Sequence, residues 1–180
     1  MMDLFLRRLS AAALIPISGW QARIPRSASA MAGFAFGLGA AVSVAAHFYL
    51  LGLALFGANR ILLGVAIADA RPARLAVVGR IFDIVAMASM PFAFALADPG
   101  RALAASFQLF GYAAACSGSP TKAKSSRGSA EFWFAISMIL GIALACLRPD
   151  WFSVVAYVVG ALGFVVAGSA IAAVLTEIDS

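Results

Sequence analysis

The sequence predicts an all-α integral membrane protein with six transmembrane helices, and three observations lead to this fold class. Hydrophobic residues make up 63% of the 180 residues, and the mean hydropathy is +0.98. Only 12% of the residues are charged, against roughly 25% in soluble domains. Turn signals divide the apolar sequence into stretches of about 20 residues, the length of a membrane-spanning helix. A chain of this size cannot hide so much apolar surface in one core, whereas lipid can.

The N-terminal segment, residues 1–26, combines leucines with arginines. Two arginines precede a short apolar run that Pro16 interrupts. A cleaved secretory signal needs an uninterrupted apolar run before a small-residue cleavage site, for which residues 28–30 are the candidate. An amphipathic helix lying in the membrane interface explains the composition better. We therefore expect a cytoplasmic interfacial helix over 1–26 and a membrane domain over 27–180.

Turn signals along the membrane domain predict six spans. Residues 27–57 carry no formal charge, which is too long for one crossing, so we place a turn near His47. A break at Pro72 ends the second span, and the turn sequence DPGR, residues 98–101, ends the third. The expected spans are 29–46, 49–68, 77–97, 102–121, 132–147 and 152–175.

The positive charges orient these spans. Eleven of the 13 Lys and Arg residues fall on the side of the N-terminus, and only Arg101 and Arg148 fall on the other side. Because cytoplasmic loops are rich in Lys and Arg, both termini are expected in the cytoplasm. The same topology accounts for the net charge of +5. No basic and aromatic surface accompanies that charge, so nucleic acid is not an expected partner.

The stretch NRILLGVAIADARPARLAVVGRIFDIVAM, residues 59–87, places ionisable side chains inside apolar sequence. Such side chains are costly in a membrane and mark a functional site or an internal ion pair. For Asp83 two interpretations stand: an ion pair with Arg60 or Arg71 of the second span, or a metal ligand. Asp69 is interpreted as a solvated acid near the cytoplasmic end.

This stretch resembles the CDP-alcohol phosphatidyltransferases. The run NRILLGVAIADAR, then G-x-x-x-D-I-V and ALADP, is similar to the family motif D-x2-D-G-x2-A-R-x8-G-x3-D-x3-D in spans two and three. AGFAFGLGAA, YLLGLAL, residues 126–128 and RPDWFSVVAYVVGAL extend the resemblance over nearly the whole chain, to one bacterial branch. The resemblance implies a transferase of phospholipid biosynthesis in the bacterial inner membrane. Such enzymes transfer a phosphatidyl or substituted phosphate group from a CDP-linked lipid donor to an alcohol, and they tend to form homodimers.

The motif positions are only partly kept. Ala70 and Arg71 match the A-R pair, Gly79 matches the second glycine and Asp83 the third aspartate, with a spacer one residue short. The resemblance implies substrate-binding roles for Asn59, Arg60, Gly64, Ala70, Arg71 and Gly79. The other motif aspartates fall on Leu63, Ala66 and Met87, and the first glycine falls on Ile67.

The missing aspartates remove the chemistry that the resemblance implies. In the family they hold divalent metal, Mg²⁺ or Mn²⁺, on the donor pyrophosphate, and the last one deprotonates the alcohol. Hard cations need oxygen ligands, and apolar side chains offer none. A general base typically contributes a factor of about 100 to 10,000, and Met87 stands at that position. We therefore expect an impaired or inactive member that keeps the lipid or nucleotide cleft.

Two alternatives remain beside this interpretation. Residues 69–74, DARPAR, also match D-[G→A]-x2-A-R, so that Asp69 and Asp83 would share one Mg²⁺ in an active enzyme with a reorganised site. This register leaves only four residues before Gly79. In the other alternative, the chain is a membrane scaffold or carrier that shares only the fold.

Overall fold

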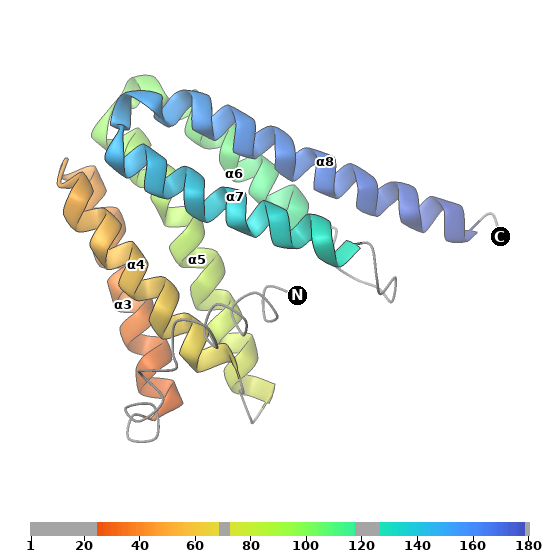
Figure 1. Cartoon of the computed structure of the whole chain (residues 1–180), viewed down its shortest axis with the longest axis horizontal. Coiled ribbons are helices and arrows are strands. Elements are labelled where there is room, and N and C mark those ends of the chain that lie inside the picture. The colour runs from red at the N-terminus through yellow and green to blue at the C-terminus, as the bar shows by residue number, and fades with distance from the viewer. Residues whose placement is uncertain (1–24, 69–72, 118–126, 179–180) are drawn as a thin grey trace.

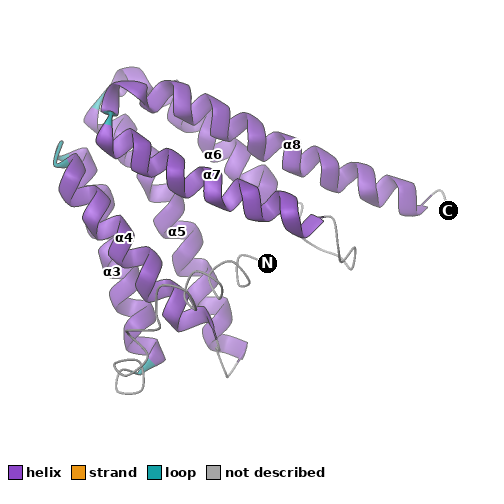
Figure 2. Ribbon diagram, in the orientation of Figure 1, coloured by secondary structure: helices purple, strands orange, loops and turns teal. Residues whose placement is uncertain are grey.

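The computed structural model describes residues 25–68, 73–117 and 127–178, and all regular secondary structure in these ranges is helical (Figure 1, Figure 2). The long helices are α3 (Arg26–Ala45), α4 (Tyr49–Ala68), α5 (Ala73–Ala97), α6 (Ala102–Ser117), α7 (Arg127–Leu147) and α8 (Phe152–Ile178). Two short 3₁₀ helices, η1 (Pro99–Arg101) and η2 (Pro149–Trp151), lead into α6 and α8. The all-α prediction is confirmed, and the helices end within a few residues of the expected spans.

Three of the described helical segments are long and apolar enough to cross a membrane: Ser27–Ala45, Val77–Ala97 and Pro149–Ala172. The apolar parts of α4 and α7, Tyr49–Gly64 and Trp133–Leu147, are shorter. Helix α6 has 16 residues, or about 24 Å at 1.5 Å per residue, less than the roughly 30 Å of a hydrocarbon core. The structure thus shows three helices that could cross a membrane, and the six-span arrangement stays a prediction. The expected interfacial helix falls almost wholly in residues 1–24, outside the described ranges.

Large apolar side chains are exposed on the long helices, as expected for surfaces that face lipid. Examples are Val42 on α3, Leu50 on α4, Leu96 on α5, Leu103 on α6, Leu140 on α7 and Val165 on α8, each at least 60% exposed. Soluble monomers rarely expose such extensive apolar surface. The exposed side chains and the three long apolar helices point to the same environment.

The helices form two groups that α5 connects. Helix α3 packs against α4 and α5, whereas α6 and α7 pack against α8 (Figure 1). Helix α5 also contacts α6, and α4 contacts α7. The largest buried side chains of the core include Phe56, Met87, Met90, Phe94 and Met138, and many alanines pack among them.

The α6–α8 pair crosses at glycines. A Cβ atom added to Gly111 would lie 2.2 Å from the carbonyl oxygen of Gly160, and one added to Gly163 would lie 2.3 Å from the carbonyl oxygen of Gly111. Only residues without side chains allow two helix backbones to approach so closely. The glycines therefore set the distance between these two helices.

The turn between α3 and α4 contains His47, as the sequence predicted. His47 has a φ of 65°, the left-handed conformation that usually favours glycine. Its N–H donates to the Val44 carbonyl at 2.9 Å, and the Phe48 N–H donates to the Ser43 carbonyl at 2.8 Å. These bonds satisfy carbonyls at the end of α3 in the Schellman pattern.

The turns before α4, α6 and α8 gather at one end of the fold (Figure 1). Stacked aromatic rings join two of these helix starts: Tyr49 and Phe94 have centroids 5.9 Å apart, and Phe94 and Phe152 have centroids 4.4 Å apart. The expected turn at residues 98–101 is confirmed, since the Asp98 carboxylate accepts a hydrogen bond from the Gly100 N–H at 3.0 Å. The polar site described next lies farther along α4 and α5.

Candidate functional site

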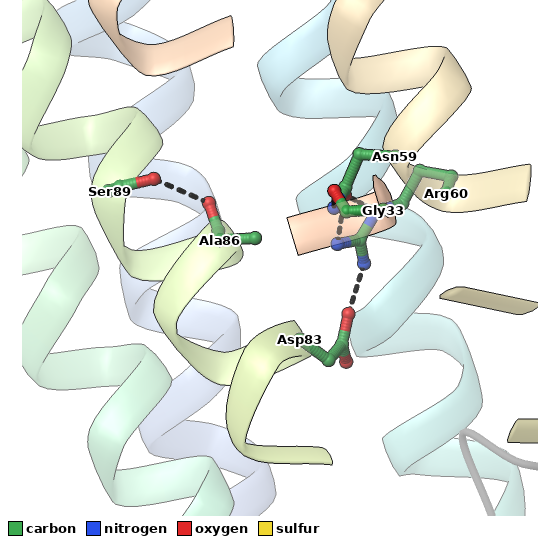
Figure 3. Close-up of polar contacts among 6 residues, drawn as sticks. All are labelled: Gly33, Asn59, Arg60, Asp83, Ala86 and Ser89. Carbon is green, nitrogen blue, oxygen red and sulfur yellow. Dashed lines mark hydrogen bonds and ion pairs between the residues drawn. The ribbon is translucent and has the colours of Figure 1, made fainter. Parts of the chain in front are cut away.

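A buried ion pair joins α4 to α5 (Figure 3). The Nη1 atom of Arg60 lies 2.5 Å from Oδ1 of Asp83. The Asp83 side chain is fully buried, and the Arg60 side chain is 11% exposed. Since an unpaired charge in such surroundings is expensive, the pairing explains how apolar helices carry both residues. The ion pair that the sequence left as one interpretation of Asp83 is thus present, and its partner is Arg60.

Asn59 fixes the position of the guanidinium group. Its Nδ2 donates to the carbonyl oxygen of Gly33 on α3 at 2.7 Å. Its Oδ1 accepts from both Nε and Nη2 of Arg60, at 2.8 and 2.5 Å. The Phe56 ring lies on the same group, with its centroid 5.2 Å from Cζ of Arg60, within the range of a cation–π interaction. Asn59 and Phe56 therefore fix the position of the guanidinium in addition to its ion pair with Asp83.

Glycines of α3 make room for this network. A Cβ atom added to Gly37 would lie 2.8 Å from Nδ2 of Asn59 and 2.7 Å from Cβ of Ala86. One added to Gly33 would lie 3.0 Å from Cγ of Leu63. Gly37 therefore leaves room for the Asn59 amide between α3 and α4, and Gly33 leaves room for Leu63.

One oxygen of the carboxylate remains available. Oδ2 of Asp83 is buried and has no hydrogen-bond partner among the described residues. Buried polar atoms in proteins are nearly always hydrogen-bonded, so this oxygen is a ready acceptor for a donor group. Tyr112 of α6 is buried and lies within electrostatic range of both Asp83 and Arg60. Nothing in the sequence signalled Tyr112.

The four positions aligned with the motif aspartates are all buried in the structure. Leu63 and Ala66 on α4, and Asp83 and Met87 on α5, are each at most 1% exposed. Gly64 and Gly79 are also buried. The aligned positions therefore point into the protein, and Asp83 alone among these four offers an oxygen ligand.

Three other predicted site residues, Asp69, Ala70 and Arg71, fall outside the described ranges, so the register that pairs Asp69 with Asp83 stays a prediction. Among the described residues, no group of three His, Cys, Asp or Glu side chains is placed to hold a metal ion. Asp83 supplies the one motif carboxylate among these residues, and its Oδ1 already forms an ion pair with the Arg60 guanidinium. The described side chains therefore do not fit the divalent metal that the family resemblance implies.

Compared with protein-family models, with curated proteins and with solved structures, the chain has no match.

Proposed function

We propose that the chain is a six-span, diverged member of the CDP-alcohol phosphatidyltransferase family. In this proposal it keeps a cleft for a CDP-linked lipid donor and lacks efficient transfer chemistry. It would reside in the bacterial inner membrane with both termini in the cytoplasm, as a homodimer. The sequence resemblance suggests the family, and the structure supplies one supporting observation. All four positions aligned with the motif aspartates are buried, yet Asp83 is the only acid among them and it is paired with Arg60.

The chemistry follows from that arrangement. Transfer of a phosphoryl-linked group from a diphosphate donor needs cations on the pyrophosphate and a base on the alcohol. Leu63, Ala66 and Met87 supply neither oxygen ligands nor a base. Because the metal ions also hold the donor pyrophosphate in the family, donor binding in this chain would rest on the matched positions that remain, among them Arg60, Gly64 and Gly79. The protein is expected to bind the donor lipid and to turn it over poorly or not at all.

The first experiment measures CDP-diacylglycerol binding to the protein in lipid nanodiscs, with and without Mg²⁺. Saturable binding supports the proposal, with phosphatidylglycerol as the matched lipid that lacks the nucleotide. Absence of binding under both conditions would sink it and would leave the scaffold or carrier alternative. Binding that is accompanied by Mg²⁺-dependent turnover, lost in both Asp69→Asn and Asp83→Asn, would instead establish the alternative enzyme with a reorganised site.

A restored variant tests the cleft itself. Leu63→Asp, Ala66→Asp, Ile67→Gly and Met87→Asp together return the missing motif groups, so headgroup transfer should become measurable with Mg²⁺. A variant that folds but neither binds nor transfers the donor would remove the main support for a retained cleft.

A further inference from the structure

The family motif implies a divalent metal ion beside Asp83, whereas this chain places the guanidinium of Arg60 there. We propose that Arg60 is the resident cation of this site, held beside Asp83 where a divalent ion would otherwise sit, so that the site binds phosphate-bearing ligands without metal. The inference rests on the proposed function only for the identity of the phosphate-bearing ligand. Its metal-free character follows from the network around Arg60.

The charge balance around Asp83 is already complete. Arg60 and Asp83 form a pair of zero net charge with an N–O distance of 2.5 Å. A divalent ion on Oδ2 would add two positive charges next to a guanidinium, in a place where Asp83 is fully buried. Buried charges without compensating partners are strongly unfavourable. Among the described residues, no group of three His, Cys, Asp or Glu side chains gathers there to offset them.

The guanidinium cannot easily swing aside to admit a metal. Asn59 accepts two of its N–H groups and is itself tied to the Gly33 carbonyl at 2.7 Å. Phe56 lies against the guanidinium at 5.2 Å. Any movement of Arg60 away from Asp83 would break these contacts together. The network therefore stabilises the guanidinium in the one position that neutralises the carboxylate.

The same group retains the capacity to bind an anion. A guanidinium carries five N–H donors, and the structure commits one each from Nε, Nη1 and Nη2. Two donors remain, and the side chain keeps 11% of its surface exposed. Guanidinium groups form short, charge-assisted hydrogen bonds to phosphate oxygens. Arg60 thus offers two N–H donors to phosphate oxygens, while Asp83 balances its charge.

The test compares metal and ligand binding in chelator-treated protein in nanodiscs. Mn²⁺ titration, followed by the electron paramagnetic resonance signal of free Mn²⁺, should show no difference in bound Mn²⁺ between the wild type and Asp83→Asn. CDP-diacylglycerol binding should be unchanged by chelator. It should weaken at least about tenfold in Arg60→Met, which corresponds to about 1.4 kcal/mol. Arg80→Met is the control, because Arg80 is an exposed arginine one turn before Asp83, and its affinity should equal that of the wild type.

The outcomes separate this inference from the proposed function. Mn²⁺ bound to the wild type and lost in Asp83→Asn or Asp69→Asn would overturn the resident-cation inference, whatever the lipid result. Chelator-sensitive lipid binding would overturn it as well. If Arg60→Met does not fold, Arg60→Lys keeps a cation in the position, and lipid binding that survives chelator in this variant supports the inference. Failure of every lipid assay would remove the proposed function, and the Mn²⁺ comparison would still decide the metal question.

Discussion

Arg60 links three helices through its side chain and that of its neighbour. It binds Asp83 of α5, while Asn59 carries the connection to Gly33 of α3 (Figure 3). Asp83 and Asn59 are both fully buried. Removal of Arg60 therefore leaves their buried oxygens without its hydrogen bonds, and removal of Asp83 leaves the guanidinium without its counter-charge. Groups that act as one network are not additive in their contributions. The network should therefore respond to mutation as a unit.

Breaking the ion pair from one side should be costly. Arg60→Met or Asp83→Leu alone is expected to lower the free energy of unfolding by about 3–5 kcal/mol, because each leaves a buried charge unpaired. The double variant replaces both charges by apolar groups and should lose much less than the two single losses combined. Thermal or denaturant unfolding in detergent measures all three variants. Simple additivity of the two losses would show that the pair is not coupled.

Substitution of Gly37 tests how closely α3 packs against Asn59. In Gly37→Ala the new methyl group would meet Cβ of Ala86 at 2.7 Å and Nδ2 of Asn59 at 2.8 Å. Overpacking of this kind typically costs about 1–3 kcal/mol. Gly57→Ala is the matched control, because a Cβ there meets nothing within 4 Å, and alanine favours the helix by up to about 1 kcal/mol. Equal melting temperatures of the two variants would contradict the close approach of α3 to α4.

At the scale of elements, the α6–α8 crossing is the closest contact between helices that the glycines reveal. Gly111 faces both Gly160 and Gly163 across this crossing. Gly160 would also be crowded by Phe107, whose ring lies 2.6 Å from an added Cβ. In a membrane, helix association depends on such packing, since lipid is as apolar as the side chains. Glycine here is required by distance and does not reflect a need for flexibility.

Two substitutions on α8 separate packing from helix propensity. Gly163→Ala places a methyl group 2.3 Å from the Gly111 carbonyl oxygen, whereas Gly168→Ala meets nothing within 4 Å. Both substitutions replace glycine by alanine and so raise the intrinsic helix propensity by the same amount. We expect Gly163→Ala to lower the melting temperature in detergent and Gly168→Ala to leave it unchanged or raised. A stable Gly163→Ala variant would show that α6 and α8 do not cross at these residues.

At the scale of the whole molecule, the turns before α4, α6 and α8 share one end of the fold (Figure 1). A chain that crosses the bilayer at each helix places these turns on one side of it. In the proposed six-span topology the opposite side would face the cytoplasm, because only Arg101 and Arg148 accompany the shared turns. The end that holds the aromatic stack should therefore face away from the cytoplasm.

Cysteine labelling tests this topology. The two native cysteines, Cys116 and Cys146, form no disulfide and are first replaced by alanine. Single cysteines at Gly100 and Asp150, both exposed in the turns, should react with a membrane-impermeant maleimide in intact cells. A cysteine at Lys124, in the polar stretch expected in the cytoplasm, should react only after permeabilisation. Labelling of all three positions from the same side would contradict the six-span arrangement.

The helices could be predicted from the sequence because turn signals and apolar length are local properties. DPGR follows the end of α5 as expected, and the uncharged run up to residue 57 divides at His47. The left-handed conformation of His47 could not be predicted, because the residue at that position is not glycine. The length criterion was less informative, since α6 is shorter than a full span. Composition alone does not show how many helices cross.

The site was only partly predictable for a different reason. Arg60 and Asp83 stood out because charge is rare in apolar sequence, and their pairing was one of the stated interpretations. The amide of Asn59 was interpreted as a substrate ligand; in the structure it bridges Gly33 and Arg60, and the ligand role stays a prediction. Which side chains meet across helices depends on how each helix is rotated about its axis. That rotation follows from the packing of α3 against α4 and α5, which the sequence does not reveal.

The pairing of two consecutive helices also bears on the biogenesis of the protein. Helix α4 carries Arg60 and helix α5 carries Asp83, with only residues 69–72 between the helices. Either charge alone at the centre of a bilayer costs about 2.5–3.5 kcal/mol on insertion scales. Once the two helices are together, each neutralises the other. Helices α4 and α5 should therefore leave the translocon as one hairpin, and a nascent chain that ends before Asp83 should retain α4 poorly in the membrane.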